Sequence, residues 1–261
     1  MQFDSKTNLL ILGSGPFGLS LSALASHLGI EHLVVGQPME FWHKHMPKGM
    51  YLRSACDWHL DPLNVHTIEA FALVQGKTNS DVEPLSLQFY QSYAEWFQQQ
   101  KGIIPLRHKI EKLDHSSTDN GFVATTDKGA TILASNVVLA PGFRHFAMVP
   151  EELMGLLPAA RFSHTCDYVD FGPARGRRYL IIGGRQSAFE WAALLLEAGA
   201  GAVHVSHRPF QTPHASSVVE FQFRPNLRTT QKPLKTPQTL VSWSFNFSLR
   251  RGLSSAFCVV Y

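Results

Sequence analysis

The chain opens with a run of apolar and glycine positions that predicts a βαβ unit. Leu9 to Leu12 is a short apolar run typical of a buried strand, and a glycine-rich turn follows it. An apolar helix then ends near Gly29, because glycine is the residue that most often terminates a helix. The segment His32 to Val35 predicts the second strand.

The same pattern recurs in the second half of the chain. Tyr179 to Ile182 predicts a strand, Gln186 to Ala198 a helix that stops at Gly199, and Ala202 to Ser206 another strand. Two such units indicate an α/β fold with two Rossmann-like dinucleotide-binding modules.

The segment between the two units contains a further helix and a hairpin. Ser86 to Lys101 carries apolar residues at helical spacing, and we interpret this stripe as core. The segments "GFVATTD" and "ATILASNVVLAPG" alternate in polarity and predict a hairpin that returns to the parallel sheet. The expected architecture is therefore three-layered, with ββα and βαβ layers.

The amino-acid composition of the chain changes after Pro213. Glu220 is the only acidic residue from there to Tyr261, and the basic residues in this segment are Arg224, Arg228, Lys232, Lys235, Arg250 and Arg251. Neither a helical stripe nor a clear alternation is evident. Because no nucleic-acid-binding motif accompanies the charge, an irregular basic tail is favoured over a nucleic-acid patch. Because no further strand pattern follows the strand that ends at Ser206, the second module is expected to be incomplete.

Composition adds few constraints. The 261 residues are 44% hydrophobic and 16% charged, which is the balance of a chain that buries a core, and the net charge of +3 does not argue for nucleic acid. The apolar stretch near the start follows Asp4 and contains several glycines, so neither a signal peptide nor a membrane span is expected. Three widely separated cysteines favour a reducing, cytoplasmic setting.

The turn after the first strand carries the first candidate site. Gly13, Gly15 and Gly18 fit the pattern G-x-G-x-x-G, with Pro16 between them. In this motif the first glycine permits the tight turn, the second lets the backbone approach a pyrophosphate, and the third allows close helix packing. The alternative is a glycine turn that only tightens the junction between strand and helix.

An acidic residue is expected at the end of the second strand, where it would bind the ribose hydroxyls. This chain has Gln37 in that region. An amide side chain can donate or accept a hydrogen bond, so Gln37 stays a candidate contact.

The second unit departs from the glycine pattern in its middle position. Gly183 and Ala188 occupy the first and last positions, and Arg185 stands where the middle glycine is expected. Arg185 would supply a cation for phosphate, with Ser187 as a further donor. Arg208, after the second strand, suits the 2′-phosphate of NADP, although an exposed basic residue after a strand is the alternative.

Histidine and aspartate residues between positions 43 and 66 raise the hypothesis of a metal site. Their spacing matches no known ligand pattern, so no metal is predicted. The cysteines, Cys56 and Cys166 among them, are interpreted as inert thiols.

These motifs together resemble the two-dinucleotide flavoprotein monooxygenases, a group that includes flavin-containing monooxygenases, Baeyer–Villiger enzymes and ornithine and lysine N-hydroxylases. The resemblance covers about residues 8 to 213 and runs in order through "GSGPFG", "FWHKHMPKGMYLRS", "PLSLQFYQSYAEWF", "VVLAPG" and "IIGGRQSAFE". The group's F-x-G-x-x-x-H-x-x-x-F/Y signature is half matched, by His164 and Tyr168, while Pro158 and Ala160 depart from it.

The resemblance implies FAD in the first module and NADPH in the second. It places Trp42, Met46, Met50 and Arg53 beside the flavin, although Trp42 and Met50 would equally suit an ordinary core. The implied domains are 1–150 for FAD, 151–213 for a partial NADPH domain, and 214–261 for an atypical basic tail, which is compositionally suited to disorder.

The implied reaction is monooxygenation of a small nucleophilic substrate. NADPH reduces FAD, and a C4a-hydroperoxyflavin formed with O₂ delivers one oxygen atom, so no catalytic side chain is assigned. Two alternatives stay open: a flavoprotein reductase or dehydrogenase without oxygen insertion, and a catalytically inactive nucleotide-binding fragment. The family's C-terminal FAD-domain strands are not recognisable after Pro213, which suggests a truncated or frameshifted chain; the sequence assigns no oligomeric state.

Overall fold

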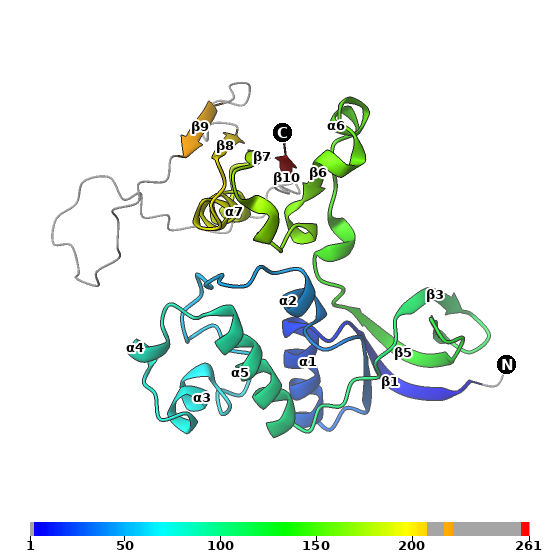
Figure 1. Cartoon of the computed structure of the whole chain (residues 1–261). Coiled ribbons are helices and arrows are strands. Elements are labelled where there is room, and N and C mark those ends of the chain that lie inside the picture. The colour runs from blue at the N-terminus through cyan, green and yellow to red at the C-terminus, as the bar shows by residue number, and fades with distance from the viewer. Residues whose placement is uncertain (1–2, 208–216, 222–256, 261) are drawn as a thin grey trace. The chain divides into compact units, whose positions relative to one another are not determined.

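A computed structural model describes residues 3–207, 217–221 and 257–260 (Figure 1). The chain divides into two compact units, the first formed by residues 1–147 and 166–170 and the second by residues 148–165 and 171–261. Arg208, which the sequence assigned to the second site, lies outside the described residues. Within the described ranges, no helix is long and apolar enough to cross a membrane.

The first unit begins with the βαβ arrangement that the sequence predicts. Its elements in chain order are β1 (Ser5–Leu12), α1 (Pro16–His27), β2 (His32–Val35), α2 (Glu40–Lys44), α3 (Ile68–Val74), α4 (Asn79–Val82), α5 (Leu87–Gln100), β3 (Ile110–Ser116), β4 (Gly121–Thr126), β5 (Thr131–Leu139) and the 3₁₀ turn η1 (Arg144–Phe146). The predicted helix at 86–101 is α5, and its N-cap Ser86 accepts a hydrogen bond from the Phe89 N–H.

The strands of the first unit form one sheet in the order β2-β1-β5-β4-β3. β1 pairs in parallel with both β2 and β5, while β3, β4 and β5 form an antiparallel meander. The hairpin predicted from alternation is therefore confirmed, and β5 carries the chain from the meander into the parallel part of the sheet.

The last three residues of β1, Leu10 to Leu12, are buried on both faces of the sheet, which explains why this strand ends in an apolar run. Ile11 belongs to a core cluster with α1 and α5, whereas Leu10 and Leu12 join a second cluster with residues of β4 and β5. Figure 1 shows α1 and α5 on one side of β1. The α/β class with Rossmann-like layers is confirmed.

The second unit repeats the parallel βαβ arrangement. Its elements are α6 (Glu151–Leu156), η2 (Ala159–Arg161), β6 (Phe162–His164), η4 (Gly172–Ala174), β7 (Arg178–Ile182), α7 (Gln186–Glu197), β8 (Ala202–His207), β9 (Ser217–Phe221) and β10 (Phe257–Val260), and η3 (Thr165–Asp167) spans the change of unit. The sheet order is β6-β10-β7-β8-β9, with only β7 and β8 parallel among the described pairs. β9 and β10 fall in the segment for which the sequence predicted no regular element.

A buried carboxylate anchors the loop between α2 and α3. The Asp61 carboxylate accepts hydrogen bonds from the N–H groups of Leu63 (3.0 Å) and His66 (2.8 Å). The Lys101 ammonium, just after α5, lies 2.8 Å from the same carboxylate, and the Asp61 side chain is fully buried. The Tyr93 hydroxyl donates to the His66 carbonyl and accepts from the Leu60 N–H, so the loop is fastened to α5 at several points.

The contacts of the Asp61 carboxylate lower its pKa. Burial alone would raise the pKa, but the Lys101 ammonium and the backbone donors outweigh it and lower the pKa to about 2. Since folding lowers the pKa, the stabilisation is present above the unfolded value of about 4 and is lost as the pH falls toward the folded value.

We expect Asp61→Asn to destabilise the first unit by about 3 kcal/mol at neutral pH, because the amide leaves the Lys101 ammonium unpaired beneath the loop. Urea denaturation followed by tryptophan fluorescence measures this change. The variant should also lose less stability than wild type between about pH 5 and pH 3, since the titrating carboxyl is gone.

Lys44→Gln is the matched control, because it breaks the exposed Glu40–Lys44 pair (2.8 Å) and should cost less than about 1 kcal/mol. Equal losses in the two variants would show that Asp61 is not an anchor.

Candidate dinucleotide sites

The first candidate site lies where β1 meets α1, and its geometry depends on two glycines. Gly13 has φ +115°, and a Cβ there would lie 2.0 Å from the Ala140 carbonyl oxygen. A Cβ on Gly18 would lie 1.9 Å from the Gly13 carbonyl oxygen. Both positions therefore exclude any side chain, and Ala140 is the residue of the "VVLAPG" segment that directly follows β5.

Gly15 differs from these two glycines. A Cβ on Gly15 would have no described atom within 4 Å, and its φ of −77° is open to other residues. The packing of the chain therefore does not require glycine here. Open space in front of the turn is what a group that approaches the backbone closely would need.

Ser14 was not among the residues that the sequence singled out. Its side chain is 2% exposed, and its hydroxyl has no hydrogen-bond partner among the described residues. A buried hydroxyl without a partner costs about 1–3 kcal/mol, which points to a missing acceptor or donor. The sequence signal was present, because Ser14 is the second residue of the glycine motif.

The start of α1 completes this site. α1 begins at Pro16 with Gly15 as N-cap, and within the described chain no side chain caps it. The first N–H groups of a helix have no partner inside the helix, and they favour an anionic group. A closed rear wall, an open front at Gly15 and the Ser14 hydroxyl together fit the pyrophosphate of a dinucleotide.

Gln37 stands at the end of β2, as the sequence predicts, and its side chain is held by another segment. Its amide donates a 3.0 Å hydrogen bond to the Arg107 carbonyl. Both residues line an open cleft of about 410 Å³. Arg107 was missed by sequence reasoning because it is 70 residues away in the chain and belongs to no motif.

The segment expected beside the flavin is largely packed into the core of the first unit. Met50 is 4% exposed, and Trp42 packs on Tyr90 with ring centroids 4.8 Å apart. Met46 is partly buried against the same cluster, whereas Arg53 is exposed. The flavin-lining role of these residues stays a prediction.

The second candidate site repeats the first with different side chains. Gly183 has φ +148°, and its N–H donates to the Ser206 carbonyl at 2.9 Å. A Cβ on Gly184 would lie 2.7 Å from the His207 Cβ, so this neighbouring glycine, which the motif pattern did not single out, allows the close approach to β8. Ala188 is fully buried in α7.

Arg185 takes the position of Gly15 without backbone strain. Both residues are helix N-caps in extended conformation, with φ −77° for Gly15 and −114° for Arg185. Arg185 is exposed and Ser187 half-buried in the first turn of α7. An arginine at a helix N-terminus strengthens the attraction for a phosphate group.

Cys56 and Cys166 are free and buried. Burial, followed by the Glu83 carboxylate, raises the pKa of the Cys56 thiol to about 12. Burial and the neighbouring Asp167 also raise the pKa of Cys166. Thiols in such surroundings stay protonated near neutral pH and react poorly.

The glycines give a prediction of stability. Gly18→Ala should destabilise the apoprotein by more than about 3 kcal/mol, because the new methyl group meets the Gly13 backbone. Gly15→Ala should change its stability by less than about 1 kcal/mol, since the space is open. Thermal unfolding of the two apoproteins measures the difference, and equal losses would contradict this description of the turn.

Cys56 gives a second prediction. In a Cys166→Ser/Cys258→Ser variant, the remaining thiol should react with a thiol-specific reagent at least about 100-fold more slowly in the folded protein than in urea. The release of the coloured leaving group measures both rates. Similar rates in the two states would show that the thiol is accessible in the native fold.

The sequence of the chain matches one family profile and parts of known proteins. The profile of the pyridine nucleotide-disulphide oxidoreductase family matches residues 10–243. The chain is 33% identical over 92 residues to a FAD-dependent urate hydroxylase of Xanthomonas campestris pv. campestris, covering 34% of this chain and 20% of that protein. It is 37% identical over 90 residues to a ferredoxin–NADP reductase of Anaplasma marginale, covering 33% of this chain and 26% of that protein.

Solved structures support the same fold. A flavin-containing monooxygenase from Stenotrophomonas maltophilia superposes with a TM-score of 0.62 at 20% identity, covering 78% of this chain and 59% of that one. A bacillithiol disulfide reductase from Staphylococcus aureus gives 0.57 at 20% identity, covering 80% and 59%. The chain thus spans less than two thirds of these relatives. Because the family profile matches most of its length, the chain belongs to the pyridine nucleotide-disulphide oxidoreductase family, whose members bind FAD and NAD(P)H.

Proposed function

We propose that this protein is an FAD-dependent oxidoreductase that uses NADPH and acts as a monooxygenase, inserting one oxygen atom of O₂ into a small nucleophilic substrate. The observation that carries the proposal is the first glycine turn, with its closed rear wall, its open front at Gly15 and the unpartnered Ser14 hydroxyl. The stretch that is 33% identical to a FAD-dependent urate hydroxylase supports the oxygen-inserting reaction.

The two domains that the sequence predicts would bind different nucleotides. Residues 1–150 would hold FAD, with the α1 N-terminus and Gly15 at its pyrophosphate. Residues 151–213 would hold NADPH, with Arg185 and Ser187 at the α7 N-terminus and Arg208 near the 2′-phosphate. FAD supplies the redox chemistry when bound, and the side chains bind, orient and exclude water.

A disulphide-exchange reaction is not part of this proposal. The buried, protonated Cys56 thiol is unsuited to attack a disulphide, which requires a thiolate. The second candidate function is therefore a flavoprotein reductase without oxygen insertion, favoured by the stretch shared with ferredoxin–NADP reductase. We also propose a cytoplasmic location and small-molecule partners, without nucleic acid.

Flavin binding tests the proposal. The purified full chain should take up FAD, and the visible flavin absorbance should bleach when NADPH is added without oxygen. Gly15→Ala should weaken FAD binding at least about tenfold, because a methyl group keeps the pyrophosphate from the backbone. Lys6→Gln, at the far end of β1, is the control that should bind FAD as wild type does.

Product analysis separates the two functions. Labelled oxygen from O₂ in a product would support monooxygenation, whereas NADPH oxidation without labelled product in a panel of amines, thioethers and ketones would favour the reductase. A chain that folds but takes up neither FAD nor NADPH would overturn both and indicate an inactive nucleotide-binding fragment.

A further inference from the structure

The cleft beside Gln37 lies at the carboxyl end of β2. It is lined by Gln37 and Met39 after β2, His43 of α2, Glu95 and Gln98 of α5, and Arg107. Ligands of open parallel sheets bind outside the carboxyl ends of the strands, and the residue after the second strand faces the ribose of the bound nucleotide. The cleft is therefore placed to receive whatever the ribose carries.

Backbone pairing fixes Arg107 at this edge. The Leu106 N–H donates to the Val34 carbonyl at 2.8 Å, and the Gly36 N–H donates to the Leu106 carbonyl at 2.9 Å. The segment thus extends the sheet by a short parallel bridge beside β2. Arg107 follows directly, and the Gln37 amide holds its carbonyl at 3.0 Å.

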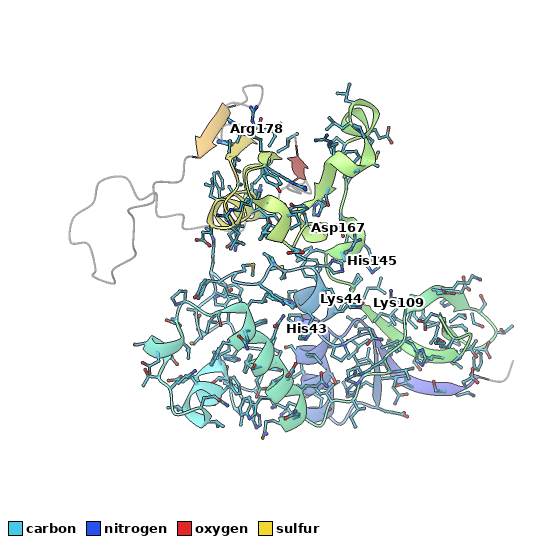
Figure 2. The ribbon with its side chains drawn as sticks, viewed as in Figure 1. His43, Lys44, Lys109, His145, Asp167 and Arg178 are labelled. Atoms are coloured by element: carbon cyan, nitrogen blue, oxygen red, sulfur yellow. The ribbon has the colours of Figure 1, made fainter. Side chains whose placement is uncertain are left out.

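Arg107 is the cation of the cleft lining, and further charged residues lie on α2 and just before β3. Glu40 pairs with Lys44 at 2.8 Å, and its pKa is lowered first by the Lys44 hydrogen bond, with Lys109 among the further causes. Figure 2 shows His43 and Lys44 on α2 and Lys109 ahead of β3. Among the described residues, no carboxylate lies within ion-pairing distance of Arg107, and the exposed Glu95 is the acidic residue of the lining.

Gln37 is neutral, so it does not repel a phosphate group in the way that the usual carboxylate at this position would. A carboxylate at this position binds ribose hydroxyls and repels a phosphate on the same ribose, whereas a nearby arginine accommodates the 2′-phosphate. An amide repels neither, and a guanidinium can hold a phosphate through two parallel hydrogen bonds.

We propose that the cleft formed by Gln37 and Arg107 binds a phosphate group on the ribose 2′-position of an adenine nucleotide seated in the first module. This inference rests on the proposed function, because it uses the same nucleotide site. Its consequence is that the FAD-free protein binds 2′-phosphorylated dinucleotides in the first module, so that an excess of them competes with FAD loading.

Competition against FAD reports on the first site, because the proposed function assigns FAD to the first module and NADPH to the second. The full-length apoprotein is titrated with FAD while flavin fluorescence is followed, with adenosine 2′,5′-bisphosphate or AMP as competitor. The two competitors differ only by the 2′-phosphate. We expect the bisphosphate to compete at least about tenfold better than AMP, a ratio that corresponds to one good charge-assisted contact.

Two variants locate the contact. Arg107→Gln should bring the two competitors to within about threefold of each other and leave AMP unchanged, because only the phosphate contact is lost. Gln37→Glu should weaken the bisphosphate and leave AMP equal or tighter, since a carboxylate favours free ribose hydroxyls. Lys6→Gln, which removes an exposed cation at the amino end of β1, should keep the wild-type ratio.

The outcomes are distinguishable. No preference for the bisphosphate in wild type, or an equal loss of both competitors in Arg107→Gln, would overturn the proposal. Inorganic phosphate that competes as well as the bisphosphate would assign the cleft to free phosphate and would also overturn it.

Failure to bind FAD would instead contradict the proposed function. In that case calorimetry of the bisphosphate and AMP with wild type and Arg107→Gln still decides the question. Loss of one bisphosphate site in the variant would support the cleft, and unchanged binding would overturn it.

Discussion

The contact between backbones at the first turn is the constraint on which the first unit depends. The Gly18 Cα lies against the Gly13 carbonyl, and Gly13 lies against Ala140, so α1, β1 and the end of β5 meet with no side chain between them. That approach places the N-terminus of α1 directly over the carboxyl edge of the sheet. The positions of Gly15, Ser14 and Gln37 all follow from it, because each belongs to a segment that leaves this junction.

The second module also brings a helix and a strand into close contact at its glycine turn, but with different residues. Its close approach to β8 is made by Gly184 against His207, and the N-cap position of α7 carries Arg185. Arg185 can therefore bring a charge to a place where the first module offers only open backbone. Both turns place an N-cap residue in extended conformation at the start of a helix. In the first turn a phosphate group would contact only the backbone, whereas in the second it would also contact the Arg185 side chain.

The sequence predicted most of the regular structure in the described chain and only part of the candidate sites. Strands and helices around both glycine turns followed from apolar periodicity, because each element carries its own pattern. Arg107 could not be found in this way, since it reaches the cleft through a parallel bridge between distant segments. Trp42 and Met50 illustrate the converse, because an aromatic or apolar residue that suits a flat ligand suits a core equally well.

The buried Ser14 hydroxyl links folding to binding. The described residues offer this hydroxyl no hydrogen-bond partner in the folded state, whereas water is its partner in the unfolded chain, and a buried hydroxyl without a partner costs about 1–3 kcal/mol. A phosphate oxygen in the turn would remove this penalty, so part of the affinity for a nucleotide is stability that the empty protein lacks. The supply of the nucleotide would then set how much of the protein is folded and how much survives proteolysis.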